Sequence, residues 1–157
     1  MKRLIPGLAI LLAGCTTAGT STTEPFSERI IPERWQQTYE EWAYAPAVRT
    51  GNRLVLSGVP AAGPGGVEKQ VERAYAVIDG LLNEAGFDRS HIIELTTFHV
   101  VSNTEELTAN LMEYEKAHKR YFEGHAYPAW SAVGVTALLS PGATVEIRVV
   151  AERPPQQ

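Results

Sequence analysis

The sequence has few side chains of the kinds that form metal centres or activated nucleophiles. Its four histidines do not follow metal-ligand spacing, and its single cysteine leaves no Cys–His cluster, so no zinc site is predicted. Ser57 and Ser131 lack the glycine-flanked turn and the neighbouring base motif of a serine hydrolase. The residue types therefore predict neither a metal centre nor a serine nucleophile. The histidines are His91, His99, His118 and His125.

Two of these histidines have a functional and a structural interpretation. His118 lies on the apolar face of a predicted helix, where a packed core residue is the more usual role. His125 directly precedes the predicted strand that contains Trp130 and is near enough along the chain to reach a cleft. A position in a surface loop is the favoured interpretation for His125.

Glu146 and Arg148 place opposite charges close together on one predicted strand. Residues two apart on a strand point to the same face of the sheet. One hypothesis is that Arg148 supplies a cation to a binding site beside Glu146. The other, equally well supported, is that Arg148 forms an ion pair with Glu146 or across a subunit contact.

Two amphipathic helices are predicted from apolar residues spaced three and four apart. The first begins at about Val67 and ends near Ala85, where Gly86 provides a C-terminal stop. The second follows Ser102, which forms a capping box with Glu105. Its apolar face contains Leu107, Leu111, Tyr114, His118 and Tyr121.

Short β-branched runs predict the strands between and around these helices. They are Arg53–Ser57, entered through the Gly51–Asn52 turn, then Ile92–Val101, Ala129–Leu138 and Thr144–Ala151. A turn at residues 140–142 joins the last two. The order strand pair, helix, strand, helix, strand pair predicts an α+β fold with one mixed sheet and both helices on one face. The uncovered face of that sheet predicts self-association.

Composition indicates one globular domain with an acidic surface. The chain has 157 residues, of which 44% are hydrophobic and 20% charged. Without Lys2 and Arg3, 12 basic side chains face 18 acidic ones, a net charge near −6. A protein with this charge repels phosphate backbones, so no nucleic-acid partner is predicted.

The N-terminus has the pattern of an exported protein. Lys2 and Arg3 precede the apolar run Leu4–Leu12, which is too short to span a bilayer and predicts a signal peptide over residues 1–14. The run Leu12-Ala-Gly-Cys15 resembles the bacterial lipobox, so Cys15 is the predicted lipidated residue. The alternative is an ordinary secretory signal with an incidental cysteine. Thr16 after the cysteine predicts a lipid-anchored protein of the cell envelope, at the outer membrane facing the periplasm if the host is Gram-negative.

Four further segments complete the predicted organisation. Residues 15–25, rich in Thr, Ser and Gly, predict a flexible tether, and residues 26–43 form an N-terminal extension. In the extension Trp35, Tyr39 and Trp42 recur at helical spacing, although simple packing onto the domain is the favoured interpretation. The main domain covers residues 44–152, followed by a tail of residues 153–157.

Several motifs of this domain resemble the Rid (YjgF-like) family and occur in the family's order. The resemblance implies a chorismate-mutase-like α+β fold, namely a mixed six-stranded sheet with two helices on one face. It also implies a homotrimer with a small-molecule cleft at each subunit interface, and cofactor-independent hydrolysis of enamines and imines. The motifs are Tyr44–Asn52, Leu54–Gly58, Glu94–Val101, Tyr127–Val135 (as part of a closing hairpin) and Gly142–Ala151.

The resemblance assigns roles to particular residues. In the family a tyrosine shapes the pocket, a strand-end pair lines it, and a glutamate on the last strand handles water. Tyr44 matches the tyrosine and Glu146 the glutamate. Ser57 and Gly58 match the strand-end pair, and Ala132 stands where the family often has a cysteine, its backbone still available to a ligand.

One position departs from the family pattern. Where the family's Pro-Ala-Arg-Ser motif has the arginine that clamps a substrate carboxylate, this chain has Trp130. Loss of such a charge partner typically weakens binding by a factor on the order of 10² to 10³. The wide apolar face of Trp130 favours a neutral or aromatic ligand, or an imine without a carboxylate.

Two classes of function therefore remain from the sequence. The first is an exported imine or enamine deaminase, a hydrolase in which Glu146 handles water and Trp130 alters specificity. The alternative is a non-catalytic envelope lipoprotein that binds a small ligand. A nuclease function is disfavoured by the acidic surface.

Overall fold

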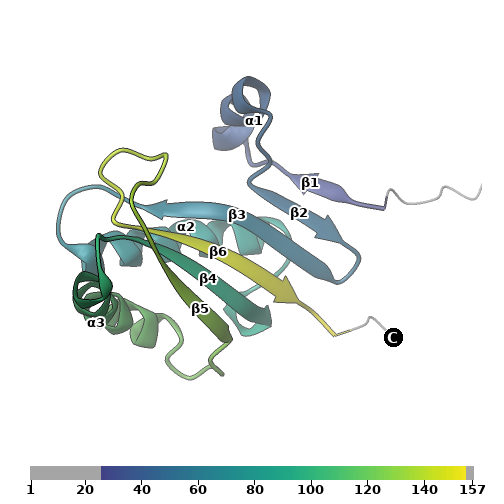
Figure 1. The fold of residues 1–157 in the computed structure, drawn as a ribbon. Helices are drawn as coiled ribbons and strands as arrows, with labels where there is room; N and C mark the ends of the chain where they lie inside the picture. Colours follow the sequence, from purple (N-terminus) through teal and green to yellow (C-terminus); the bar gives the residue numbers. More distant parts are fainter. Residues whose placement is uncertain (1–25, 155–157) are drawn as a thin grey trace, which may run out of the picture.

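A six-stranded mixed sheet forms the centre of the structure, a computed structural model that describes residues 26–154 (Figure 1). The strands are arranged in the order β1-β2-β3-β6-β4-β5, with β4 and β5 parallel and all other neighbours antiparallel. The predicted α+β fold with a mixed six-stranded sheet is confirmed. The strands are β1 (Glu28–Ile30), β2 (Ala47–Thr50), β3 (Arg53–Ala61), β4 (Ile92–Val100), β5 (Ala129–Val135) and β6 (Val145–Glu152).

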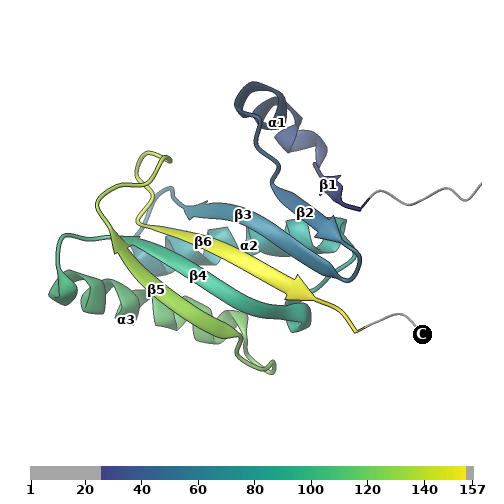
Figure 2. The ribbon, with the colours of Figure 1, turned by 45° about the vertical axis from the view of Figure 1, so that its right-hand side comes forward.

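Two long helices cover one face of the sheet, as predicted. These are α2 (Val67–Glu84) and α3 (Thr104–Tyr121), which lie side by side behind the strands (Figure 2). A short third helix, α1 (Gln36–Trp42), follows a 3₁₀ turn at Glu33–Trp35 and stands beyond the end of the sheet (Figure 1). Another 3₁₀ turn, Arg89–His91, leads into β4. In residues 26–154 no helix is both long and apolar enough to cross a membrane.

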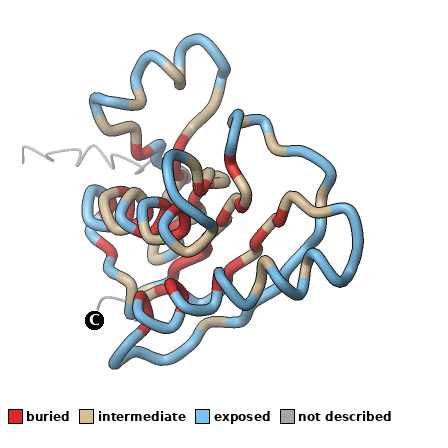
Figure 3. The backbone as a smooth tube through the Cα atoms, turned by 90° about the vertical axis from the view of Figure 1, so that its left-hand side faces the viewer, coloured by how far each residue is buried: buried red, intermediate tan, exposed pale blue. Residues whose placement is uncertain are grey.

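The core fills the layer between the helices and the sheet. Leu54, Leu56 and Ile147 point from the strands to the helices and have no exposed surface, and Ile78 and Leu82 meet them from α2. Figure 3 shows the buried segments gathered where the two layers face each other. The apolar alternation of β3 and β6 therefore defines a helix-facing side and an open side of the sheet.

The expected closing hairpin is wrong, because β5 and β6 are not neighbours. α3 returns the chain beside β4 as a crossover, so β5 pairs in parallel with β4 at the edge of the sheet. β6 then enters between β3 and β4 and pairs antiparallel with both. Five of the eight residues of β6 are buried, whereas six of the seven residues of β5 are exposed, as expected for a central and an edge strand.

The predicted capping box of α3 is wrong by one residue. Asn103, not Ser102, is the N-cap, and its Oδ1 accepts a 2.8 Å hydrogen bond from the backbone N–H of Glu106. The carboxylate of Glu106 in turn accepts the backbone N–H of Ser102 at 2.8 Å. Asparagine caps a helix as well as serine does, and the sequence contains both in succession.

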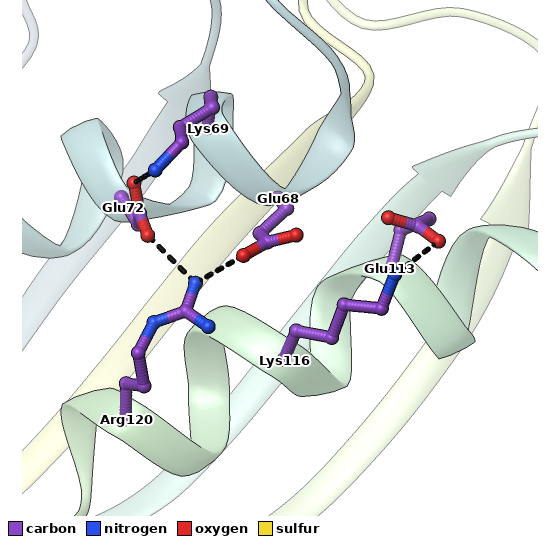
Figure 4. Close-up of polar contacts among 6 residues, drawn as sticks. All are labelled: Glu68, Lys69, Glu72, Glu113, Lys116 and Arg120. Atoms are coloured by element: carbon purple, nitrogen blue, oxygen red, sulfur yellow. Dashed lines mark hydrogen bonds and ion pairs between the residues drawn. The ribbon is translucent and has the colours of Figure 1, made fainter.

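Ion pairs join the outer surfaces of the two helices (Figure 4). The guanidinium of Arg120 on α3 binds the carboxylates of Glu68 and Glu72 on α2, the latter at 2.6 Å, and Lys69 binds Glu72 at 2.8 Å. These groups are solvent-exposed, so water screens them and their contribution to stability is small. The apolar layer beneath them holds the helices in place.

The cap of α3 gives a stability prediction with a matched control. Asn103→Ala should lower the free energy of unfolding by about 0.5–2 kcal/mol, because the first turn of α3 loses its side-chain acceptor. Ser102→Ala keeps the backbone N–H bound to Glu106 and should change the free energy of unfolding little. Urea denaturation of the two variants measures both values, and equal losses would contradict the assignment of the cap.

Candidate functional site

Glu146 lies directly over the backbone of Gly58 on the open side of the sheet. The register of β3 against β6 shifts between Leu56 and Val59, which places Ser57 and Gly58 in a β-bulge beside Glu146. A Cβ atom on residue 58 would lie 2.8 Å from Cγ of Glu146 and would overlap its carboxyl group. Residue 58 must therefore be glycine for the carboxylate to occupy this place.

Hydrogen bonds of Tyr44 and Ser57 join the segment before β2 to the bulge. The hydroxyl of Ser57 donates a 2.8 Å hydrogen bond to the carbonyl oxygen of Ala45, and the backbone N–H of Ser57 donates to the carbonyl of Pro46. The hydroxyl of Tyr44 makes a long bond, 3.4 Å, to the carbonyl oxygen of Gly58. The structure therefore brings together four of the predicted site residues: Tyr44, Ser57, Gly58 and Glu146.

Three of these residues adjoin a cavity of about 500 Å³ whose outer wall is the N-terminal extension. Its size is in the range of small-molecule sites. Trp35 and Trp42 supply aromatic rings opposite the sheet, and the rings of Trp35 and Tyr44 lie 6.1 Å apart. The complete lining is Trp35, Thr38, Trp42, Tyr44, Gly58, Pro60, Leu139, Ser140 and Glu146.

The part of this lining that lies outside the family motifs was not predicted from the sequence. The signal for the tryptophans was present, because Trp35, Tyr39 and Trp42 recur at helical spacing in the extension. The structure confirms a short helix there, and Trp35 packs against the core as the favoured interpretation predicted. Trp42, in contrast, is 65% exposed and lines the cavity. Leu139 and Ser140 come from the loop between β5 and β6, which carries no pattern that predicts a site.

The electrostatics of the cavity depend on Glu146, the only charged residue that residues 26–154 contribute to its lining. Partial burial raises the pKa of the Glu146 carboxyl above its usual value, because leaving water penalises the charged form. Burial also raises the pKa of the Tyr44 hydroxyl; the side chain of Ser57 partly offsets this rise, and the nearby charge of Glu146 adds to it. A carboxyl group tuned in this way is suited to exchanging protons with a bound molecule or water.

Arg148 shares the open face with Glu146, as predicted, but does not line the cavity. Its guanidinium lies 3.8 Å from the carboxylate of Glu94 on β4, and both side chains are largely exposed. The ion pair in this protomer therefore joins Arg148 to Glu94 and not to Glu146.

Trp130 and Ala132 lie on the opposite face of the sheet from Glu146. In the parallel register Trp130 pairs with Leu95, whose side chain points to the helices. The indole ring stacks on Tyr114 and on His118 of α3, with ring centroids 5.1 and 5.2 Å apart. Within one protomer neither Trp130 nor Ala132 reaches the cavity beside Glu146.

A chain of hydrogen bonds fixes Trp130 in this position. Its Nε1–H donates to the hydroxyl of Thr97 at 2.9 Å, and that hydroxyl lies 2.8 Å from Nε2 of His99. Nδ1 of His99 lies 2.7 Å from the side-chain oxygen of Asn110. Burial lowers the pKa of His99, so a neutral ring accepts from Thr97 and donates to Asn110.

The other histidines lie outside the cavity. His118 is buried, which confirms the packed role expected for it, and burial lowers its pKa to about 4. His125 is exposed in the loop after α3 and lies near Asp79 and Arg89. Among residues 26–154, no three His, Cys, Asp or Glu side chains are grouped in a way that could hold a metal ion.

Comparisons with known proteins match nearly the whole described chain. A family model described as Endoribonuclease L-PSP matches residues 36–153. The RutC family protein YjgH of Escherichia coli K12 is 31% identical over 132 residues, covering 81% of this chain and 95% of that protein.

Solved structures show the same fold. The structure of protein YJGH has a TM-score of 0.69 and 28% identity, covering 83% of this chain and 99% of that chain. Rv2704 of Mycobacterium tuberculosis, a member of the YjgF/YER057c/UK114 family, has a TM-score of 0.69 at 24% identity, covering 81% and 99%.

The raised pKa of Glu146 gives a prediction for the pH dependence of stability. A carboxyl group with a higher pKa in the folded chain stabilises the fold fully below its unfolded pKa, and that stabilisation is lost as the pH rises through the folded pKa. Glu146→Gln removes the titration. The difference in unfolding free energy between the variant and the parent should therefore shift in favour of the variant as the pH rises.

Urea unfolding from about pH 4 to about pH 8 measures this difference across the titration range of a carboxyl group. Ser102→Ala, at an exposed position without a titratable side chain, is the control and should give a curve parallel to that of the parent. Parallel curves for the parent and Glu146→Gln would contradict the burial of the carboxyl group.

Proposed function

The chain belongs to the endoribonuclease L-PSP family, which includes the RutC and YjgF-like proteins, and on that basis we propose that it hydrolyses small imines or enamines. The observation that carries the proposal is the position of Glu146. Its carboxyl group lies over Gly58, is partly buried, and faces an aromatic cavity of small-molecule size.

The hydrolysis needs one group that can accept and return a proton. As the oxygen of water attacks the carbon of the protonated imine, Glu146 takes one proton from the water and a neutral carbinolamine forms. Glu146 then returns this proton to the nitrogen. As the C–N bond breaks, Glu146 takes the proton of the carbinolamine hydroxyl and passes it to the departing ammonia, so that a carbonyl compound and ammonium leave. A raised pKa suits both steps, because the carboxyl group then exchanges protons nearer to neutral pH.

The lining of the cavity argues for a substrate without a carboxylate. A substrate such as 2-aminoacrylate would bring a second negative charge beside Glu146, and within the described part of the chain no lysine or arginine lines the cavity to pair with it. At the position of the family arginine, Trp130 uses its N–H for Thr97 and its ring for stacking. We therefore propose that specificity is altered away from carboxylate-containing imines.

The charge of the chain argues against a nuclease function, although the family is described as Endoribonuclease L-PSP. RNA binding needs basic side chains for the phosphates, and the full chain has a net charge of −4. A non-catalytic ligand-binding role is the alternative that fits the cavity. Replacement of Glu146 distinguishes the two functions, because a hydrolase should lose turnover whereas a binding protein should change only in affinity.

Self-association would complete the site. The open face of the sheet includes Val133, which is 41% exposed, and Trp130 on the edge strand is 39% exposed. We propose a homotrimer that covers the open face and in which β5 adds Trp130 and Ala132 to the cleft of a neighbouring protomer.

The turnover of the full-length protein tests the proposed activity. With an imine that lacks a carboxylate, Glu146→Gln should lower kcat by roughly 10²- to 10⁴-fold, because no group accepts the proton of water. Gly58→Ala should also lower kcat, since the added Cβ displaces the carboxyl group.

The matched control is Gly66→Ala. A Cβ at residue 66 meets no atom within 4 Å, and the backbone φ there is −75°, so turnover should be unchanged. Equal turnover by the parent and Glu146→Gln, or no turnover of any imine or enamine, would contradict the hydrolase proposal. Ligand binding without turnover would favour the alternative.

We also propose that the protein is anchored in the bacterial envelope through Cys15, which lies outside the described residues. Cys15→Ser should remove the acceptor of the lipid, so expression in a Gram-negative host should move the protein from the membrane fraction to the soluble fraction. Labelling with a radioactive fatty acid should mark the parent and not the variant. Unlabelled parent protein in the soluble fraction would contradict the anchor.

A further inference from the structure

We infer that the cavity beside Glu146 selects a positively charged organic ligand, such as a protonated imine or an alkylammonium group. The inference names the substrate class of the proposed site and in that respect rests on the proposed function. It is carried by the described side chains that line the cavity with this carboxylate, which include three aromatic rings and no basic group.

The charge of Glu146 has no counterion in the described part of the chain. None of the ion pairs among residues 26–154 includes Glu146, and the guanidinium of Arg148, two residues away, is paired with Glu94. A partly buried carboxylate without a partner is stabilised by a cation that enters the cavity with a bound molecule. An anionic ligand would be repelled by the same group.

The aromatic walls favour the same kind of ligand. The faces of tryptophan and tyrosine rings carry negative electrostatic potential and attract ammonium groups, and tryptophan is the strongest of them. Trp35, Trp42 and Tyr44 all line the cavity. The cation–π contacts within residues 26–154 involve the rings of Tyr121 and Phe87, so no arginine of the described chain covers these three faces.

The N-terminal extension supplies the tryptophans, and the sheet supplies the carboxylate. Trp35 ends the 3₁₀ turn before α1, and Trp42 is the last residue of α1. The extension therefore determines which ligand enters, while Glu146 and Gly58 on β6 and β3 determine what happens to it. For a protonated imine the overall reaction is R₂C=NH₂⁺ + H₂O → R₂C=O + NH₄⁺, in which charge and atoms balance.

Choline and its neutral isostere 3,3-dimethylbutan-1-ol test the selection of charge without any reaction. Isothermal titration calorimetry of the full-length protein should show choline binding about tenfold or more tightly than the alcohol, because the two differ in charge and hardly in shape. Equal affinities, tighter binding of the alcohol, or binding of neither would overturn the inference.

Substitutions at Trp42 test the aromatic wall. Trp42→Leu keeps an apolar side chain but removes the ring face, so choline affinity should fall roughly 2- to 30-fold, and by more than the affinity for the alcohol. Trp42→Phe should retain more of the choline affinity. Trp42 is 65% exposed, so these variants should fold, and Phe26→Leu, at a 90% exposed position outside the cavity, is the matched control.

The outcomes separate the inference from the proposed hydrolase function. Choline is not hydrolysed, so its binding is measured whether or not the protein turns over an imine. If the protein hydrolyses imines but binds choline no more tightly than the neutral alcohol, the inference is overturned and the hydrolase proposal remains supported. An unchanged choline affinity in Trp42→Leu, with an altered sedimentation coefficient, would show that Trp42 is a subunit contact and would also overturn it.

Discussion

The contact between the carboxyl group of Glu146 and the backbone of Gly58 is the constraint from which the site follows. Only glycine leaves room for a carboxylate at this point, and the β-bulge brings the strand close enough for the two to meet. The carboxylate is then held away from bulk water, which raises its pKa. The proposed proton chemistry and the proposed selection of a ligand both depend on this placement.

The alternation of side chains along β6 places its core residues on one face of the sheet and its charged residues on the other. Ile147 and Val149 point to the helices and form part of the core, whereas Glu146 and Arg148 point to the open face. The same alternation on the edge strand places Trp130 on the helix side, among aromatic and hydrogen-bonded partners. Within one chain Trp130 and Glu146 are therefore on different faces, so the proposed shared cleft would need a second copy of the chain.

Much of this arrangement could be predicted from sequence, because periodicity reports burial. The two long helices, the strand faces and the grouping of Tyr44, Gly58 and Glu146 followed from spacing and family motifs. The pairing of β5 with β4 could not be predicted, because periodicity indicates which face of a strand is buried and not which strand lies beside it. The cavity wall formed by Trp35 and Trp42 could not be predicted either. Aromatic residues at helical spacing are compatible both with packing on the core and with exposure at the surface.

The most direct test of this account is the pKa of Glu146, measured by NMR titration of its side-chain carboxyl carbon in the parent and in Gly58→Ala. The account predicts a pKa above the usual value in the parent, because the carboxyl group is partly buried over Gly58. It predicts a return toward that usual value in Gly58→Ala, where the carboxylate is displaced toward water. An ordinary pKa in the parent, or the same raised pKa in both proteins, would contradict the central claim.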